Sequence, residues 1–403
     1  MTDKFILLML GVFPLWTGFD GYADITRAKF LFFAVATSLW IVLTFICAII
    51  AREKPNFSSV SVCAVIFAAA ACVSAVFSPL RRFVLIGVGR YDGLLSLLLY
   101  CAIFVGVTAY GKKKPLYLKV FAASMCVCCA VGILQLFGLD PFDLFPGGYT
   151  YYDSGKLYTG EFLGTIGNVD LLCALLVIAV PALFLVYIIF SKPFALLPAS
   201  FLLYVGLLCG VSAFRLALIA GCAVGLPFVI KKEHTKRLVF ALLTVVFVCI
   251  CAHFTPLGLH SSAFASDIST LGSGRLEIWS KLLSMVKERP LLGGGPGTVA
   301  MRVNITWSRY VEETGRTLSV YVDNAHNEYL GYLLDLGALG LASYLLMVLI
   351  TSVTFIKKQR APLAVGICCY FVQSFFGLGL CLVLPVIWTL WALSCVDNTV
   401  RLN

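Results

Sequence analysis

Charged side chains are scarce in this sequence of 403 residues. Only 12% of the residues are Asp, Glu, Lys or Arg, whereas hydrophobic residues make up 61%. Soluble domains carry about a quarter charged residues and about half apolar ones. The composition therefore excludes a soluble enzyme, a nucleic-acid-binding protein and a disordered scaffold, and it predicts a polytopic membrane protein.

Apolar runs fill most of the chain, and a membrane-spanning helix needs about 20 such residues. We therefore expect an all-α fold with about twelve transmembrane helices. The runs lie near residues 5–19, 28–51, 58–78, 91–111, 116–138, 169–190, 194–211, 213–230, 238–254, 328–356, 361–377 and 379–396. The last two runs are short, and they are the place where this count is most easily wrong by one hairpin.

The net charge of +10 is concentrated in alternate gaps between these runs. Short loops rich in Lys and Arg stay in the cytoplasm, so these clusters place both termini inside. The first run lacks a clear small-x-small cleavage site, and we interpret it as a retained anchor instead of a cleaved signal peptide. The basic clusters lie at 52–54, 112–114, 192, 231–237 and 357–360.

Two segments on the predicted outer side interrupt the apolar pattern. One is a short loop at 139–168, and the other is a large loop at 255–327. The chain is thus expected to consist of nine helices over 1–254, the large loop, and three helices over 328–403. Loops that a rigid scaffold positions often carry the chemistry of a protein, so we expect an extracytoplasmic site.

The large loop is expected to contain amphipathic helices. The first covers 275–289, ends at Pro290 and lies on the bilayer or on the other helices. A second short helix is expected near 298–313. The apolar face of the first helix is predicted from four residues at helical spacing, which are Leu276, Trp279, Leu283 and Val286.

Signatures of metal and cofactor chemistry are missing. The outer segments contain no Asp-x-Asp or His-x-x-x-His motif, and no Walker, Gly-x-Ser-x-Gly or dinucleotide fingerprint has a suitable context. Gly293, Gly295 and Gly297 could cradle a phosphate, but no strand is predicted before them, so we interpret this turn as a connector. All sixteen cysteines fall within predicted helices, which favours packing over disulfides. We expect no metal and no cofactor.

Three residues that can carry charge lie at the outer ends of predicted helices. Arg215 is near the start of the run at 213–230, Arg275 begins the loop helix, and His326 precedes the run at 328–356. Taken alone, each has an ordinary interpretation. Arg215 can be an arginine that reaches the membrane interface, Arg275 a solvated charge and His326 a structural histidine.

Together, the three residues suit a reaction with an anionic leaving group. Helix N-termini attract anions, and two arginines there could grip a diphosphate with bidentate hydrogen bonds. The same positive field should keep His326 neutral near pH 7, which is the form that a general base needs. The spacing of the three residues does not by itself require them to meet.

Other polar residues near the outer ends have weaker signals. Arg81, Arg82 and Arg90 break the charge rule, which indicates contact with an anion or a lipid headgroup. Asn168 opens the run at 169–190, where it suits a helix N-cap.

Several of these positions match motifs of one known family. In this order, and over nearly the whole chain, the motifs resemble those of the O-antigen ligase and polysaccharide polymerase superfamily. They are Arg90-Tyr91-Asp92-Gly93, Gly164-Thr-Ile-Gly167-Asn168, Ser212-Ala-Phe-Arg215, Arg275-x-x-Ile278-Trp279, Pro290-Leu-Leu-Gly293-x-Gly295-Pro-Gly297-Thr298 and Asn324-Ala-His326-Asn-x-Tyr329-Leu330. One departure is Val169-Asp170, where relatives often have Pro-Asn.

The resemblance implies a metal-independent, inverting glycosyltransferase on the outer face of the plasma (inner) membrane. Its donor would be a glycan on a polyprenyl diphosphate, usually undecaprenyl diphosphate, and its acceptor a hydroxyl of a glycan, lipid or protein. Arg215 and Arg275 would bind the diphosphate, and His326 would activate the acceptor hydroxyl. The further expected contacts with the diphosphate or glycan are Arg81, Arg82, Arg90, Asn168, Asn324 and Tyr329.

Three functions stay open at this point. A ligase moves a finished chain to a final acceptor, whereas a polymerase joins one lipid-linked repeat to another, and we favour the ligase. A membrane transporter would also have many helices, but its charged residues would lie at mid-membrane on broken helices. Here they cluster at the outer ends of helices. The bilayer is an expected partner, and nucleic acid is not.

Overall fold

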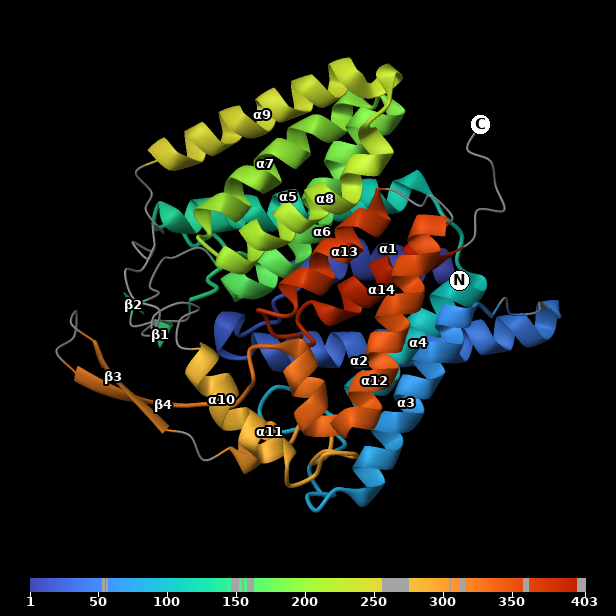
Figure 1. The fold of residues 1–403 in the computed structure, drawn as a ribbon, viewed down its shortest axis with the longest axis vertical. Helices are drawn as coiled ribbons and strands as arrows, with labels where there is room; N and C mark the ends of the chain where they lie inside the picture. Colours follow the sequence, from blue (N-terminus) through green and yellow to red (C-terminus); the bar gives the residue numbers. More distant parts are fainter. Residues whose placement is uncertain are drawn as a thin grey trace.

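The computed structural model describes residues 1–52, 55, 57–145, 152–153, 156–157, 163–255, 275–303, 306–311, 316–357 and 362–396. In these ranges the protein is a helical bundle with two small antiparallel pairs of strands (Figure 1). The α-helices are α1 (Thr2–Leu7), α2 (Ile25–Ala51), α3 (Ser59–Phe77), α4 (Leu94–Tyr110), α5 (Pro115–Leu136), α6 (Val169–Phe190), α7 (Leu196–Leu208), α8 (Ser212–Val229), α9 (Thr235–Phe254), α10 (Arg275–Val286), α11 (Val299–Arg302), α12 (Glu328–Lys357), α13 (Leu363–Gln373) and α14 (Leu384–Cys395).

The strands form two separate hairpins. β1 (Tyr152–Asp153) pairs with β2 (Lys156–Leu157), and β3 (Thr306–Val311) pairs with β4 (Arg316–Tyr321). Short π or 3-10 turns complete the regular structure. They are η1 (Leu8–Val12), η2 (Phe13–Leu15), η3 (Gly21–Ala23), η4 (Pro193–Ala195) and η5 (Lys232–His234).

Every apolar run of the sequence forms helix, which makes the protein a polytopic, helical membrane protein. Seven helical segments in the described part are long and apolar enough to cross a membrane, and they correspond to α2, α3, α5, α6, α8, α9 and α12. Four shorter apolar segments of 10–17 residues contain α4, α7, α13 and α14. The first run is broken into α1, η1 and η2, and none of these reaches membrane length. The number of membrane crossings therefore stays a prediction.

Local sequence signals set several helix boundaries. The side chain of Ser58 accepts a hydrogen bond from Ser61 N (3.2 Å) and caps α3. Asn168 caps α6 in the same way, accepting from Leu171 N (3.0 Å). These caps satisfy N–H groups that have no partner inside the helix. Pro115 occupies the first position of α5, where its missing N–H costs nothing.

Helix α6 lies at the centre of one half of the bundle. It is apolar on all sides and mostly buried, and it contacts α7, α8 and α13. A helix that is apolar all round must be enclosed by other helices or by lipid. In Figure 1, α6 lies among these three helices, so here the enclosure comes from the protein.

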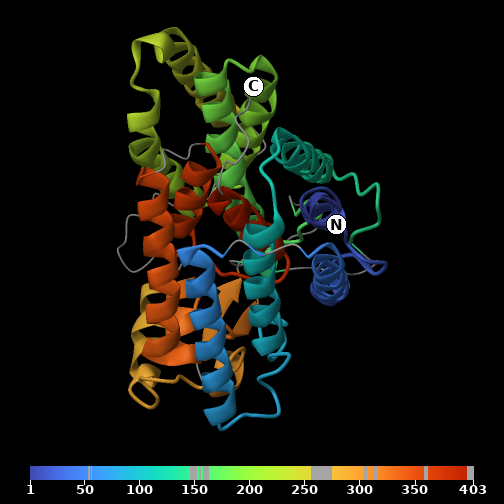
Figure 2. The ribbon, with the colours of Figure 1, turned by 90° about the vertical axis from the view of Figure 1, so that its right-hand side faces the viewer.

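Helices α3, α4, α12 and α14 form the other half around an aromatic core. Figure 2 shows α3, α4 and α12 running side by side, with α1 and α2 seen nearly end-on. Trp388 and Trp391 of α14 are fully buried, and their rings lie 5.3 Å apart between centroids. Trp391 also meets Tyr344 of α12 edge-on at 6.0 Å. Such edge contacts add to the area that the rings bury.

The helices at the periphery expose apolar side chains. In the segments that contain α2 and α9, only 17% of the residues of the apolar stretch are buried inside the protein. Exposed apolar helices of this length are stable in lipid, not in water. The exposed residues of α9 include Val239, Phe240, Leu242, Leu243, Val246, Phe247 and Ile250.

Helix α12 is broken in its middle. Gly337 has φ 68° and ψ −169°, a conformation that ends one helical stretch and starts another. A segment of the large loop, residues 290–298, fills this break, and we call it the glycine segment. Added Cβ atoms on Gly293 and Gly337 would lie 2.4 and 2.3 Å from the facing backbone, so glycine is required at both positions.

The glycine segment provides hydrogen bonds that the broken helix lacks. A membrane helix must satisfy its own backbone, because lipid offers no partner. Ser74 of α3 also donates to Asp335 O (2.8 Å) and ties the break to its neighbour. The four backbone bonds are Gly294 N to Leu334 O (3.0 Å), Gly295 N to Asp335 O (2.8 Å), Ala338 N to Pro290 O (2.8 Å) and Leu339 N to Leu291 O (3.2 Å). These bonds agree with our interpretation of the glycine turn as a connector.

The loop helix α10 forms as expected, but its packed face differs from the predicted one. Ile278 and Leu282 are buried against α12, with Trp279 partly buried beside them. Leu276 and Leu283, which we placed on the packed face, are 56% and 52% exposed. The helix therefore has apolar residues on two sides. The pattern of apolar residues at helical spacing did not distinguish the packed side from the exposed one.

The second expected loop helix, near 298–313, is wrong for most of its length. Only Val299–Arg302 is helical, and Thr306–Val311 is strand β3. This stretch contains β-branched and aromatic residues that favour a pleated strand, and its partner β4 follows close behind. The expected short loop at 139–168 and the start of the large loop lie largely outside the described residues.

One end of the bundle carries contacts between the helices and the described part of the large loop. Ser78, which follows α3, donates to Gly294 O (2.6 Å), and Val88 N donates to Gly297 O (3.0 Å). We call this the loop end. Asp3 and Lys114, both at predicted cytoplasmic positions, form an ion pair with each other.

Candidate functional site

The turn that carries His326 joins β4 to α12 and is held from several sides. His326 has φ 47°, a left-handed conformation that is uncommon outside glycine but that His, Asn and Asp adopt more often than other residues. Asn324 Oδ1 accepts a hydrogen bond from His326 N (3.0 Å), and Asn327 Oδ1 accepts one from Leu330 N (3.0 Å). The indole of Trp279 donates to Ala325 O (2.8 Å), which anchors the turn on α10.

Arg275 links three elements at the loop end. As the first residue of α10, it donates from Nη1 to Phe376 O (2.5 Å), which follows α13. Its Nη2 lies 3.3 Å from Asp170 Oδ2 in the first turn of α6. The guanidinium is mostly buried by these partners, so its position is defined without any ligand.

Arg90 reaches the same turn from the connection between α3 and α4. Its Nε and Nη2 donate to the two carboxylate oxygens of Asp323 at 2.6 and 2.8 Å. This bidentate geometry is the strongest form of an arginine–carboxylate pair. Asp323 precedes His326 by three residues, so the pair brings a second guanidinium to the histidine.

The surroundings of His326 keep its ring neutral. The pKa of His326 is lowered to about 4, first by burial and then by the positive charges of Arg275 and Arg90, while the negative charge of Asp323 acts in the opposite direction. Burial and nearby like charge both disfavour the imidazolium form. The neutral imidazole expected from the sequence agrees with this lowered pKa. The expected cause was the field at a helix N-terminus, whereas the causes in the structure are burial and the two guanidinium groups.

Arg215 lies in the first turn of α8 with an exposed side chain. Helices α8 and α13 pack antiparallel, because Gly221 faces Cys369 and Gly225 faces Val365. Extending this register places the start of α8 level with the end of α13, where Phe376 O accepts from Arg275. Among the described residues, Arg215 makes no hydrogen bond or ion pair with His326 or Arg275.

The weaker candidates have structural partners of their own. Asn168 caps α6, and Asn324 holds the backbone of His326. Tyr329 donates its hydroxyl to Phe371 O (2.7 Å). Arg81 and Arg82 lie on the turn after α3, and in the described part of the chain neither makes a hydrogen bond or ion pair with His326. Their expected roles in binding the donor stay predictions.

Two carboxylates near the site were missed as site residues. Asp323 holds Arg90, and Asp170 faces Arg275. The signal in the sequence was their position, since Asp323 stands within the motif around His326 and Asp170 is the departure from the family pattern. Their partners come from elements more than 100 residues away, and only the fold reveals such pairs.

A buried glutamate lies two residues beyond His326. Glu328 accepts hydrogen bonds from the hydroxyls of Tyr332 (3.0 Å), Tyr344 (2.9 Å) and Tyr370 (2.5 Å). It lines a cavity of about 60 Å³ that also touches Asp92 and Asp335. In the described residues, no group of three His, Cys, Asp or Glu side chains is arranged to hold a metal ion. We therefore interpret this glutamate network as the anchor of the His326 turn.

Comparison with known proteins identifies the central part of the chain. Residues 172–345 match the family model described as O-antigen ligase. No curated protein matches the chain. The matched region contains Arg215, Arg275 and His326 as well as the glycine segment and the break in α12. Through residues 172–345, less than half of its length, the chain is similar to the O-antigen ligase family.

Proposed function

We propose that this membrane protein transfers a glycan from a polyprenyl diphosphate, such as undecaprenyl diphosphate, to a hydroxyl acceptor. The transfer would need no metal ion and would occur at the outer face of the plasma membrane, with both termini in the cytoplasm. The similarity of residues 172–345 to the O-antigen ligase family supports a glycan-handling reaction. The observation that carries the finer proposal is the neutral His326 beside Arg275 and Arg90.

The two guanidinium groups suit the leaving group of such a transfer. A diphosphate gains negative charge as the bond from the anomeric carbon to its oxygen breaks. Arg275 and Arg90 are held in place by Asp170 and Asp323, so little reorganisation is needed when the anion arrives. Donors that are fixed in advance stabilise developing charge best, and the loss of one typically slows a reaction about 100-fold or more. Arg215, at the same level of the bundle, would complete this cationic wall.

The imidazole of His326 suits the acceptor side of the reaction. The acceptor oxygen attacks the anomeric carbon while its proton passes to a ring nitrogen of His326. The bond to the diphosphate breaks, and the electron pair leaves with the diphosphate. An attack from the face opposite the leaving group would invert the anomeric centre. His326 then carries the positive charge of the transferred proton, the released diphosphate carries the added negative charge, and the new glycosidic bond is neutral.

Binding of the donor would also improve the base. A group with a pKa of about 4 is a weak base at neutral pH. The donor's diphosphate would offset the positive charge of Arg275 and Arg90, which is one cause of this low pKa. We therefore propose that His326 becomes more basic in the donor complex than in the free protein. The proton transfer is thus coupled to occupation of the donor site.

A transporter is the second class to weigh, because α12 is a broken helix. Transporters place their substrates at such breaks. In this protein the glycine segment fills the break and satisfies its backbone groups. The buried charge at the break is also paired, since Arg302 Nη2 lies 3.0 Å from Asp335 Oδ1. This filled break favours a structural role, and it supports the transferase over the transporter.

The test is His326→Asn in cells, with lipid-linked glycans measured by mass spectrometry at matched protein levels. Asn tolerates the left-handed backbone at this position, so the turn should persist while the base is lost. We expect the glycan to accumulate on the polyprenyl carrier. Long chains on the carrier would identify a ligase, and single repeats would identify a polymerase.

His253→Asn is the matched control, because His253 is an exposed histidine near the end of α9. Cells with this variant should show the wild-type pool of lipid-linked glycans. If the His326→Asn cells also keep that pool, the base assignment fails and the transporter becomes the better hypothesis.

A further inference from the structure

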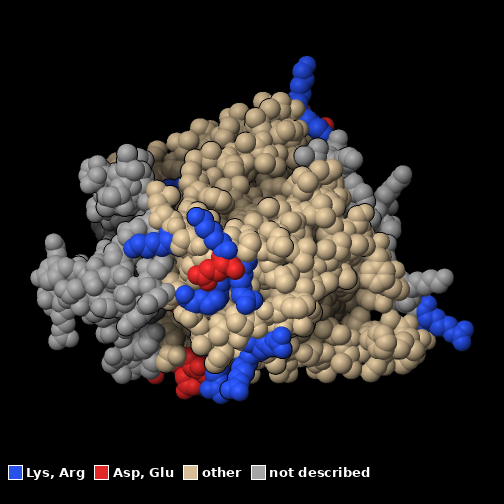
Figure 3. Space-filling model, turned by 60° about the horizontal axis from the view of Figure 1, so that its bottom comes forward, with Lys and Arg blue, Asp and Glu red and all other residues tan. Residues whose placement is uncertain are grey.

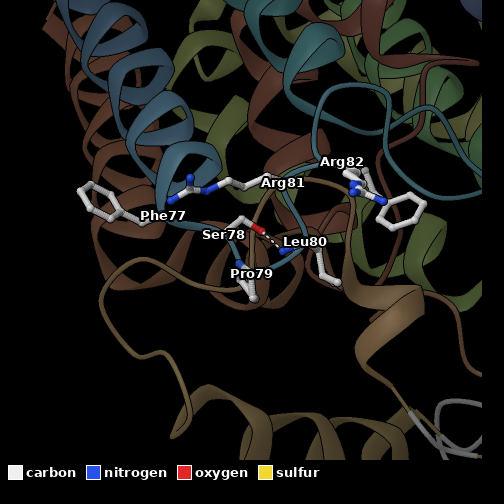
Figure 4. A pocket seen from close by; sticks show the side chains of 7 residues that line it. Phe77, Ser78, Pro79, Leu80, Arg81 and Arg82 are labelled. Atoms are coloured by element: carbon white, nitrogen blue, oxygen red, sulfur yellow. Dashed lines mark hydrogen bonds between the residues drawn. The ribbon is translucent and has the colours of Figure 1, made fainter.

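The turn that follows α3 presents two adjacent arginines that the proposed transfer does not use. Both Arg81 and Arg82 are exposed. They line an open pocket of about 490 Å³ formed by Phe77–Phe83. In Figure 4, Arg81 extends toward Phe77, and Arg82 extends in the opposite direction. The two guanidinium groups thus diverge.

This turn is rigidly built. Ser78 Oγ donates to Gly294 O (2.6 Å) and accepts from Leu80 N (3.0 Å), as the dashed line in Figure 4 shows for the second bond. Phe83 N donates to Leu80 O (2.9 Å), and Gly87 N donates to Phe83 O (2.8 Å). The arginines are therefore displayed at fixed positions of the loop end.

The loop end has positive charge that the protein itself does not neutralise. Arg90, Arg275 and Arg302 each face an aspartate. In the described part of the chain, neither Arg81 nor Arg82 forms an ion pair with a carboxylate. Figure 3 shows Lys and Arg side chains gathered on this face with few acidic ones among them. An anion from outside the protein would balance this charge.

Exposed apolar side chains flank the two arginines. Phe77 is 58% exposed, Phe83 43% and Leu85 54%. They lie where a helix of membrane length ends, because α3 stops at Phe77. Aromatic residues favour the interface between lipid and water, and an arginine there reaches the phosphate level of the lipid. The combination describes a membrane interface that contains anionic groups.

We propose that Arg81 and Arg82 bind the phosphate groups of anionic phospholipids in the leaflet around the loop end. A single diphosphate needs convergent donors, whereas these two point apart and suit the headgroups of neighbouring lipids. Lipids held here would fix the depth of the loop end in the bilayer. The proposal rests on the membrane-embedded fold and not on the transfer reaction, so it can fail or succeed separately.

The experiment is native mass spectrometry of the purified full-length protein with phosphatidylglycerol and phosphatidylethanolamine. The variant Arg81→Gln/Arg82→Gln removes both charges from exposed positions. Each basic residue near a membrane surface contributes about 1 kcal/mol to binding of anionic lipid. We therefore expect retention of phosphatidylglycerol to fall about tenfold or more, with retention of phosphatidylethanolamine unchanged.

The matched control is Arg27→Gln/Lys287→Gln, which removes the same charge from two other exposed side chains. It should retain phosphatidylglycerol nearly as well as the wild type. Equal retention in the two double variants would overturn the proposal. Unchanged phosphatidylglycerol with a loss of bound polyprenyl diphosphate would also overturn it, and would assign the two arginines to the donor. An unchanged apparent melting temperature verifies that each variant is folded.

Discussion

At the scale of single residues, the site depends on how His326 is held. Its left-handed backbone is fixed by Asn324, and its ring lies beside two guanidinium groups that other aspartates orient. Arg275, His326 and Arg90 were all candidates in the sequence, since charged residues at the outer ends of helices are rarely accidental in membrane proteins. Asp170 and Asp323 were not candidates, because their role is to pair with arginines that are distant in the sequence, and only the fold shows these pairs.

The low pKa of His326 predicts an unusual pH dependence. We expect kcat/KM for glycan transfer to stay flat from about pH 8 down to about pH 5 and to fall only near the pKa of about 4. The reason is that kcat/KM reports the pKa of the free protein, where burial and two arginines favour the neutral ring. The measurement is a pH–rate profile with purified protein and lipid-linked donor. A midpoint near 6.5 would show a solvated imidazole and contradict the site.

The lowered pKa of His326 also affects the folding stability of the protein, because the unfolded chain has to be compared with the folded one. Because the folded-state pKa is depressed, the unfolded chain binds the proton more readily, and folding stability is lost as pH falls from about 6.5 toward 4. The variant His326→Asn should lack this part of the acid sensitivity. Comparison of apparent melting temperatures at pH 7 and pH 5 in the two proteins separates it from other acid effects.

At the scale of elements, the long apolar helices were predictable and the irregular segments were not. Runs such as 169–190 become helices because a membrane leaves the backbone no other way to pair. The break at Gly337 was hidden inside an unbroken apolar run, because its partner is the glycine segment almost 50 residues earlier. Strand β3 was mistaken for helix because its pairing with β4 is not apparent from the local sequence.

The broken helix predicts contrasting effects of two glycine substitutions in α12. Gly337→Ala should destabilise the protein by about 2 kcal/mol or more, since alanine is strained at φ 68° and its Cβ would meet the Leu291 carbonyl at 2.3 Å. Gly331→Ala is the control, because an added Cβ there meets nothing within 4 Å. Alanine at Gly331 should leave the protein unchanged or slightly more stable. Apparent melting temperatures in detergent measure both, and an equal response would contradict the filled break.

At the scale of the whole molecule, the order of the helices along the chain was predictable, whereas the number of membrane crossings stays a prediction. The contacts at the loop end join 77–93, 168–170, 275–303 and 323–327, which are the segments that the charge rule places outside. Helices α13 and α14 have 11 and 12 residues, so the last two runs are too short to span separately at full thickness. Composition cannot reveal such shortening, because short turns between helices are as apolar as the helices.

Sidedness gives a prediction for the whole chain. Alkaline phosphatase inserted at 256–274 should be active, since the large loop is expected outside, whereas the same insertion at 231–236 should be inactive. Matched insertions of green fluorescent protein should show the reverse pattern, because that protein matures in the cytoplasm. Activity at both positions, or the inverse result, would contradict the in/in topology of the termini.

The filled break in α12 also constrains how the protein is made. Residues 290–298 leave the ribosome before 328–357, so the partner of the broken helix is synthesised before that helix reaches the membrane. The hydrogen bonds that close the break join segments that are separated in the chain by α11, β3, β4 and the residues that connect them. A longer or shorter hairpin would keep this order of synthesis. If the glycine segment followed α12 in the chain, the break in α12 would lack its hydrogen-bond partners when that helix enters the membrane. The position of the large loop before α12 in the sequence thus makes the partner of the broken helix available before the helix itself is synthesised.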